Sequence, residues 1–197
     1  MTDLNIEPSP AGWLDAVFVD FDAFLQDHAS CEKKASGMAL NIAAHYPDQA
    51  AIVAAMADLA VEELGHYREV IRLLIDRGVP PGPDRKDTYV RALNDEIRRG
   101  PDYFLLDRLL VAAIIERRGN ERFGLIAARL SAEAFPGSDR LAAFYRAITS
   151  SEDRHWQLFL ELARHHCPGL PMESRLAELV QKERGLMLAQ PFAAALH

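Results

Sequence analysis

The stretch EKKASGMALNIAAHYPDQAAIVAAMADLAVEELGH, residues 32–66, carries a pattern that returns 89 residues later in the chain. Each copy holds a Glu, a Pro 15 residues further on, and a Glu-x-x-His that begins 31 residues after the first Glu. The matched positions are Glu32, Pro47, Glu63 and His66, and then Glu121, Pro136, Glu152 and His155. Each copy predicts two helices joined by a tight turn at the proline. Two such hairpins would supply four carboxylates and two imidazoles, the ligand set of a carboxylate-bridged di-iron site inside a four-helix bundle.

Four long proline-free stretches are predicted to be the helices of these hairpins. They are rich in Ala, Leu, Glu and Arg, which favour helices, and none shows the sustained alternation of a strand. They cover residues 11–46, 48–79, 102–135 and 137–167. The connection between the hairpins, residues 78–101, is long enough to cross between them and holds a short amphipathic helix over 87–99. We therefore predict an all-α fold, a ferritin-like four-helix bundle with a long crossover connection and extra short helices.

Length and composition predict a single domain over residues 1–197, with its core in about residues 10–167. A chain of this length can bury one sizeable core. The hydrophobic fraction of 49% and the charged fraction of 26% are typical of globular proteins. Residues 172–189 are expected to form a shorter peripheral helix, and the tail from Pro191 is expected to be loose.

Several simple features bear on the compartment. The first residues show no basic region followed by an apolar run, so no signal peptide is visible. No uninterrupted apolar stretch approaches the ~18 residues that span a bilayer, so no membrane association is expected. The two cysteines, Cys31 and Cys167, do not form a C-x-x-C motif, which fits a reducing cytoplasm.

The candidate ligands lie in line with apolar residues at helical spacing. Glu32 falls on one stripe with Leu25 and Ala39, and the Glu-x-x-His motifs fall on similar stripes of their helices. A carboxylate in such a place must be buried and paired, or it would cost several kcal/mol. The alternative, that these are solvated Glu–His pairs on helix surfaces, would suit a polar stripe. His28, one turn before Glu32, is either a hydrogen-bond partner of that carboxylate or a satisfied core histidine.

The carboxylate of the third long helix could come from Glu121 or from Glu116. Glu121 lies 15 residues before Pro136, as in the first copy, which places it level with the other candidates. Glu116 would lie about 7 Å lower at a rise of about 1.5 Å per residue. Against Glu121, Arg118 shares its helix face, whereas Glu116 shares a face with apolar residues that include Phe123. We expect Glu121 to be the ligand and keep Glu116 as the alternative.

The expected metal site has six protein ligands. They are Glu32, Glu63, His66, Glu121, Glu152 and His155. Oxygen-rich ligation with only two imidazoles suits iron or manganese and argues against structural zinc. We expect two iron ions in an Fe–O–Fe type site, bridged by the glutamates of the two Glu-x-x-His motifs. Such a site can use O₂ as a co-substrate, with electrons from an external donor.

Several strings resemble the bacterial tRNA hydroxylase family that acts on methylthio-isopentenyl-adenosine. They are WLD at 13–15, HASCEKKA at 28–35, EELGH at 62–66, ERF at 121–123 and SEDRH at 151–155. The resemblance covers about residues 10–165. It implies a ferritin-like bundle with a non-haem di-iron centre that hydroxylates the isopentenyl group of a modified adenosine beside the tRNA anticodon. Residues 117–120, RRGN, depart from the expected small residues and Cys of this family, and they bear on substrate choice.

The resemblance implies a tRNA anticodon loop and a redox partner protein as partners, although the chain carries a net charge of −7. RNA binding would then need a local basic surface. The candidate residues are Lys33, Lys34, Arg117, Arg118, Arg122 and Arg154, with Arg122 and Arg154 equally suited to buried pairing. The rival functions are iron storage or ferroxidase activity, another di-iron oxidase, and a metal-free interaction module. We expect a monomer or a dimer, because a storage protein would form a large shell.

Overall fold

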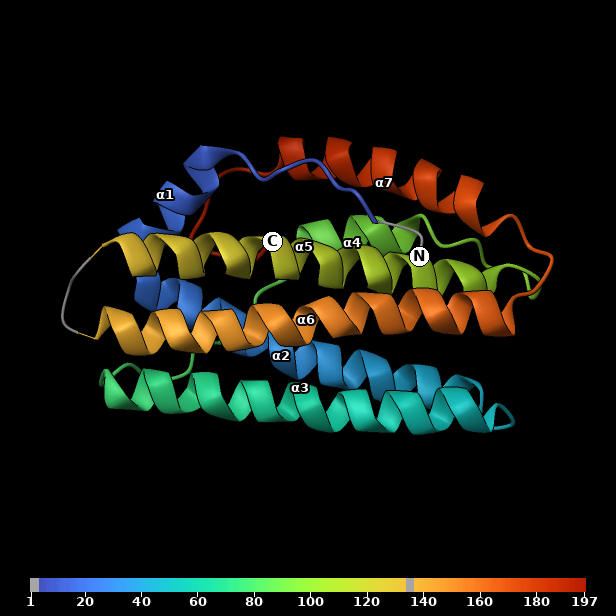
Figure 1. Ribbon diagram of the computed structural model, residues 1–197, viewed down its shortest axis with the longest axis horizontal. Coiled ribbons are helices and arrows are strands. Elements are labelled where there is room, and N and C mark those ends of the chain that lie inside the picture. The colour runs from blue at the N-terminus through green and yellow to red at the C-terminus, as the bar shows by residue number, and fades with distance from the viewer. Residues whose placement is uncertain (1–3, 134–136) are drawn as a thin grey trace. The chain divides into compact units, whose positions relative to one another are not determined.

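The computed structural model describes residues 4–133 and 137–197, and within them it contains seven helices and no strand (Figure 1). The helices are α1 (Ala11–Val19), α2 (Phe21–His45), α3 (Ala50–Asp76), α4 (Thr88–Asp95), α5 (Phe104–Ala132), α6 (Ser138–His166) and α7 (Met172–Ala189). The all-α prediction is confirmed. The chain forms two compact units. The first unit is residues 15–86 and 192–196, and the second unit is the rest of the described chain.

The hairpin of the first unit consists of α2 and α3. The predicted helix over residues 11–46 is in fact two helices, because the chain breaks at Asp20. The Asp20 carboxylate accepts a hydrogen bond from the backbone N–H of Ala23 at 3.0 Å and so caps the start of α2. Asp48, expected to cap α3, does not do so, since the cap position is Gln49. Gly78, at φ 72°, follows the end of α3 as predicted.

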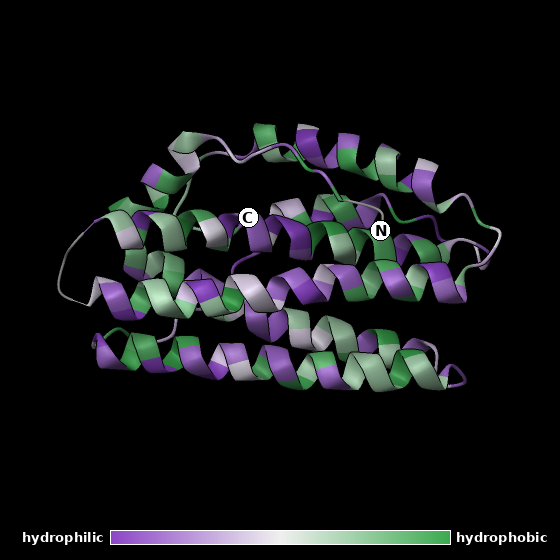
Figure 2. Cartoon of the chain, in the orientation of Figure 1, coloured by the Kyte–Doolittle hydropathy of each residue, from purple (hydrophilic) through white to green (hydrophobic). Residues whose placement is uncertain are grey.

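The two helices of this hairpin bury apolar residues along one side. Ile42 of α2 and Ile52, Met56 and Val70 of α3 are 1% exposed or less. Apolar and polar residues alternate in short segments along each long helix, as expected for amphipathic helices (Figure 2). The Ser36 hydroxyl donates a hydrogen bond to the carbonyl oxygen of Ala60 at 2.9 Å, so a polar contact also joins α2 to α3.

The second unit contains the hairpin of α5 and α6, with α4 and α7 packed against α5. The predicted turn at Pro136 lies outside the described residues. Phe123 and Tyr145 pack at 5.8 Å between ring centroids and join α5 to α6. The helix α7 has the predicted bounds, but it is more than a peripheral addition. Its Leu179 and Glu183 are fully buried.

One buried carboxylate of α5 fixes the chain that follows α4 and the start of α7. Asp107 is fully buried and accepts hydrogen bonds from Arg98 Nη2 at 2.6 Å and from Arg175 Nη2 at 2.8 Å. Burial would raise the pKa of Asp107, but these two arginines outweigh burial and hold the pKa below its usual value. Asp107 therefore remains charged and joins three segments of the second unit.

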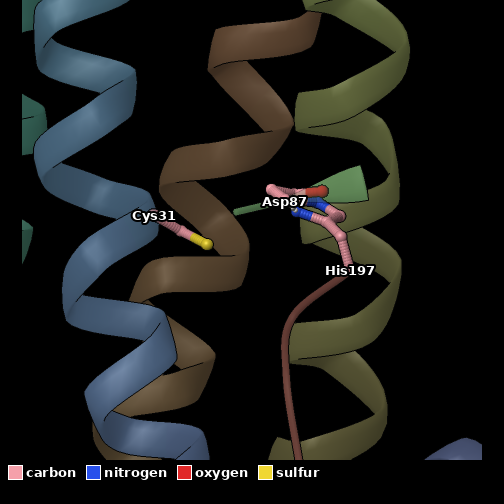
Figure 3. Close-up of side chains that lie close together, drawn as sticks. All are labelled: Cys31, Asp87 and His197. Carbon is pink, nitrogen blue, oxygen red and sulfur yellow. Dashed lines mark hydrogen bonds and ion pairs between the residues drawn. The ribbon is translucent and has the colours of Figure 1, made fainter. Parts of the chain in front are cut away.

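The C-terminal tail is ordered, so the expectation of a loose tail is wrong. Within the first unit, Leu196 is 4% exposed and its backbone N–H donates to Asp27 Oδ2 at 2.8 Å. Within the second unit, His197 Nδ1 lies 3.0 Å from Asp87 Oδ2, and its ring stacks on Tyr89 at 5.0 Å (Figure 3). Specific polar and aromatic contacts, which composition does not reveal, order the tail.

We predict that Asp107→Asn lowers the free energy of unfolding at pH 7 by about 3 kcal/mol, the usual cost of breaking a buried ion pair. Because the folded pKa lies below the ordinary 3.8, the charge stabilises the fold above that pH. This contribution is lost as the pH falls through the lowered folded pKa. Urea unfolding at pH 7 and at decreasing pH measures both effects. The exposed Asp102→Asn is the control, and an equal cost for both variants would contradict the prediction.

Candidate metal centre

The hairpin of the first unit brings together three of the predicted ligands, here called the first ligand group: Glu32, Glu63 and His66. Their ligand atoms all lie within 4.8 Å of one another. His66 Nδ1 lies 3.5 Å from Glu32 Oε2 and 3.4 Å from Glu63 Oε2. The Glu-x-x-His spacing places Glu63 and His66 on one face of α3, toward Glu32 of α2. Glu32 and Glu63 are buried and His66 is nearly so.

His28 holds the Glu32 carboxylate from the other side. It is fully buried one turn before Glu32 on α2, and its Nε2 lies 2.6 Å from Glu32 Oε1. The two oxygens of Glu32 therefore face two different imidazoles, His28 and His66. This contact decides between the two interpretations of His28 in favour of a hydrogen-bond partner, which orients the carboxylate.

The imidazoles set the charge of this group. Burial would raise the pKa of Glu32, but hydrogen bonds with His28 and His66 outweigh burial and lower it. Burial would lower the pKa of His66, but hydrogen bonds to Glu32 and Glu63 outweigh burial and raise it to about 10. His66 therefore carries a proton at neutral pH and offsets the two carboxylates. A metal cation could take over this role, because a ligating imidazole must be neutral.

The hairpin of the second unit holds a matching set, here called the second ligand group: Glu116, Glu152 and His155. Their ligand atoms also lie within 4.8 Å of one another. His155 Nδ1 lies 3.5 Å from Glu152 Oε2, in the same i, i+3 relation as in the first ligand group. All three side chains are buried. Each hairpin thus offers two carboxylates and one imidazole that could hold a metal ion.

Glu121, the expected ligand of the third long helix, does not join the second ligand group. Its carboxylate accepts hydrogen bonds from the backbone N–H of Ser9 at 2.9 Å, from the Ser9 hydroxyl at 2.7 Å and from Arg118 Nη1 at 3.1 Å. Five residues along a helix correspond to a rotation of about 140°, so Glu116 and Glu121 face different neighbours. The alternative, Glu116, occupies the place that the repeat assigned to Glu121.

The repeat misled because its prolines do not mark the same point of the two hairpins. The helix α2 ends two residues before Pro47, whereas α5 ends four residues before Pro136. Counting back from the proline therefore gives the wrong level on α5. The helix-face argument, in which Arg118 opposes Glu121 as a ligand, agrees with the structure.

Arg118 and Arg122, expected as candidates for an RNA-binding surface, are buried instead. Arg118 is fully buried and its Nε donates to Glu183 Oε1 at 2.8 Å, while the Tyr89 hydroxyl donates to the same oxygen at 2.9 Å. Arg122 is 4% exposed, and its guanidinium lies 4.5 Å from the centroid of the Trp13 ring. These arginines hold α7 and the N-terminal segment on α5.

Tyr89 and Glu183 were not predicted to take part in any polar cluster. A usable signal was present for Glu183, since it follows Leu176 and Leu179 at helical spacing and precedes Met187 on the same side of α7. A charged residue in such a stripe needs a buried partner. Its partner, Arg118, lies on another helix 65 residues away, so the pairing itself is not visible in the sequence.

The fold and the ligand groups are those of the ferritin-like class of helical proteins. The chain is similar to the solved structure "Protein 43 with aldehyde deformylating oxygenase activity from Synechococcus". The TM-score is 0.86 and the sequence identity is 31%, over 96% of this chain and 93% of that chain. This likeness confirms the ferritin-like fold class that the sequence predicts.

Sequence comparison identifies the family within that class. The family described as "tRNA-(MS[2]IO[6]A)-hydroxylase (MiaE)" matches residues 3–197, so the chain belongs to this family of oxygenase enzymes. Two curated relatives are named "tRNA 2-(methylsulfanyl)-N(6)-isopentenyladenosine(37) hydroxylase". The one from Pseudomonas putida KT2440 is 34% identical over 93% of this chain and 86% of its own length. The one from Salmonella typhimurium LT2 is 31% identical over 55% of this chain and 38% of its own length.

None of the described helices is both long and apolar enough to cross a membrane.

Proposed function

We propose that this chain is an O₂-dependent, non-haem di-iron monooxygenase whose substrate is tRNA. It hydroxylates the isopentenyl group of methylthio-isopentenyl-adenosine beside the anticodon. The observation that supports this most is the buried pair of carboxylates with one imidazole in each hairpin, in a chain whose relatives are named for this reaction. A tRNA substrate also supports the cytoplasm as the compartment.

In this proposal the two ligand groups act together and hold two iron ions. The six ligands are Glu32, Glu63, His66, Glu116, Glu152 and His155. Neither group alone has enough protein ligands for a pair of metals, whereas the two together match the four carboxylates and two imidazoles of a di-iron carboxylate site. The two units would then work as the single domain that the sequence predicts. Glu121 takes no part as a ligand, because Ser9 and Arg118 hold its carboxylate.

When bound, the iron pair would supply the activation of O₂, with electrons from an external donor such as a redox partner protein. The side chains of the chain itself do the positioning. His28 orients Glu32 through the 2.6 Å contact. The buried ligand groups lie among apolar residues such as Met56 and Phe159, which exclude water from the reacting centre.

The solved relative suggests a rival reaction, because it is named for aldehyde deformylating oxygenase activity. Both reactions would use the same kind of metal site, since a shared fold does not fix the substrate. The higher identity of the curated tRNA hydroxylase, together with the family match over residues 3–197, favours tRNA.

The decisive product analysis is mass spectrometry of nucleosides from tRNA incubated with reduced, iron-loaded protein and O₂. We expect methylthio-isopentenyl-adenosine to gain one oxygen atom, and we expect Glu63→Ala to abolish the product because it removes a ligand. A parallel incubation with a long-chain aldehyde tests the rival reaction. Aldehyde turnover without any change in the tRNA nucleoside would contradict the proposal.

The iron content of two variants tests the choice between Glu116 and Glu121. We expect Glu116→Ala to lose most of the bound iron, because the variant removes one of the two carboxylates of the second ligand group. The matched Glu121→Ala should keep its iron and instead lower the melting temperature, because Ser9 and Arg118 lose a partner. Iron loss confined to Glu121→Ala would return the assignment to the repeat.

A further inference from the structure

We propose that Lys33, Lys34, Arg85 and Lys86 form one phosphate-binding surface, here called the cation surface, to which the backbone of a single-stranded RNA loop binds. The inference rests on the proposed tRNA substrate and says where on the first unit that substrate is held. All four residues belong to the first unit, two from α2 and two from the connection that follows α3.

The connection after α3 is fixed along one face of α2. Gln26 Nε2 donates to the carbonyl oxygen of Pro80 at 2.7 Å, the Ser30 hydroxyl donates to Asp84 Oδ1 at 3.0 Å, and Lys34 Nζ donates to the carbonyl oxygen of Arg85 at 2.7 Å. The three donors are spaced four residues apart, so they occupy three successive turns of one helix face. A solvated loop would not need a donor at every turn.

The residues of the connection make it stiff. Prolines at 80, 81 and 83 restrict the backbone, and Gly82 lies so close to α2 that an added Cβ would meet the Gln26 side chain at 3.2 Å. A stiff segment held by three anchors presents its last two residues, Arg85 and Lys86, in a defined place. Both side chains are exposed. Little ordering entropy remains to be lost when they bind a ligand.

The cation surface has a strong excess of positive charge. Asp84 is the only carboxylate that its four residues contact in the described chain, and its oxygens lie 2.8 and 3.0 Å from Lys33 Nζ. Asp84 is also held by Ser30, so it serves to fix the connection. Three cations remain without a carboxylate partner in a chain whose net charge is −7. Such a local group is what an acidic protein needs to bind a phosphate backbone.

The cation surface lies next to the first ligand group in the sequence of both helices. Lys33 directly follows Glu32 on α2, and it interacts electrostatically with Tyr67, which directly follows His66 on α3. Cations beside an aromatic ring are a common combination for single-stranded nucleic acid, because phosphates and bases are bound together. A loop held there would keep an unstacked nucleotide close to the ligands.

The remaining cations that the sequence offered for RNA binding are engaged elsewhere. Arg118 and Arg122 are buried. Arg117 donates to the carbonyl oxygen of Leu4, and Arg154 donates to the carbonyl oxygen of Ser150 on its own helix. The lysines of α2 therefore remain, and the connection adds two cations that sequence spacing did not associate with them.

The test measures binding of iron-loaded protein to an anticodon stem-loop RNA by fluorescence anisotropy at several salt concentrations. We expect the double variant Arg85→Ala/Lys86→Ala to bind more weakly. The slope of log K against log salt should become shallower by about 1.4, at about 0.7 for each lost contact with single-stranded RNA. The charge-conserving Arg85→Lys/Lys86→Arg should restore binding. The matched control, Arg140→Ala/Arg164→Ala, removes two exposed cations of α6 and should leave the slope unchanged.

The outcomes separate this inference from the proposed function. If wild type hydroxylates tRNA and the Arg85/Lys86 alanine variant keeps its affinity and slope, the cation surface is overturned and the proposed function stands. If wild type binds the stem-loop through the cation surface but leaves the tRNA nucleoside unchanged, the hydroxylase proposal fails and the binding surface stands. Equal losses in the α6 control variant would also overturn the cation surface, because they would indicate a general charge effect.

Discussion

A carboxylate buried inside a helical hairpin needs a positive partner, and this requirement determines what the buried acids of this chain can do. Asp107 and Glu183 are paired with arginines, whose charge cannot be removed by deprotonation. Glu32 and Glu63 are paired with histidines instead. An imidazole can give up its proton and become a neutral ligand, so a metal ion can take over the compensation of charge. Arginine-paired acids are therefore structural, and histidine-paired acids are candidates for metal binding.

The same distinction explains why Glu116 and Glu121 have different roles although both lie on α5. Glu121 lies beside Arg118, and through Ser9 it fixes the N-terminal segment. Glu116 lies with Glu152 and His155, near no arginine of that cluster. The departure from the family pattern at residues 117–120 has a related explanation, because Arg118 joins α5 to α7. This stretch contributes to the stability of the second unit, and the cations for RNA come from the first.

Helix periodicity, proline positions and the Glu-x-x-His repeat predicted the class of fold, the long helices and the bounds of α7, because these depend on local spacing. They did not predict the break at Asp20, which a single capping hydrogen bond decides. They also failed where partners are distant in sequence, as in the pairing of Arg118 with Glu183 and the contact of Leu196 with Asp27. The ligand on α5 depended on helix face more than on distance from a proline. The cation surface was missed because Arg85 and Lys86 lie in a connection without periodicity.

The central claim is that the two ligand groups together hold a pair of irons. Mössbauer spectroscopy of iron-loaded, oxidised protein tests it most directly, because two irons joined by bridging ligands couple magnetically and isolated irons do not. The account predicts two irons per chain and a diamagnetic, exchange-coupled spectrum. One iron per chain, or the spectrum of uncoupled ferric ions, would contradict it.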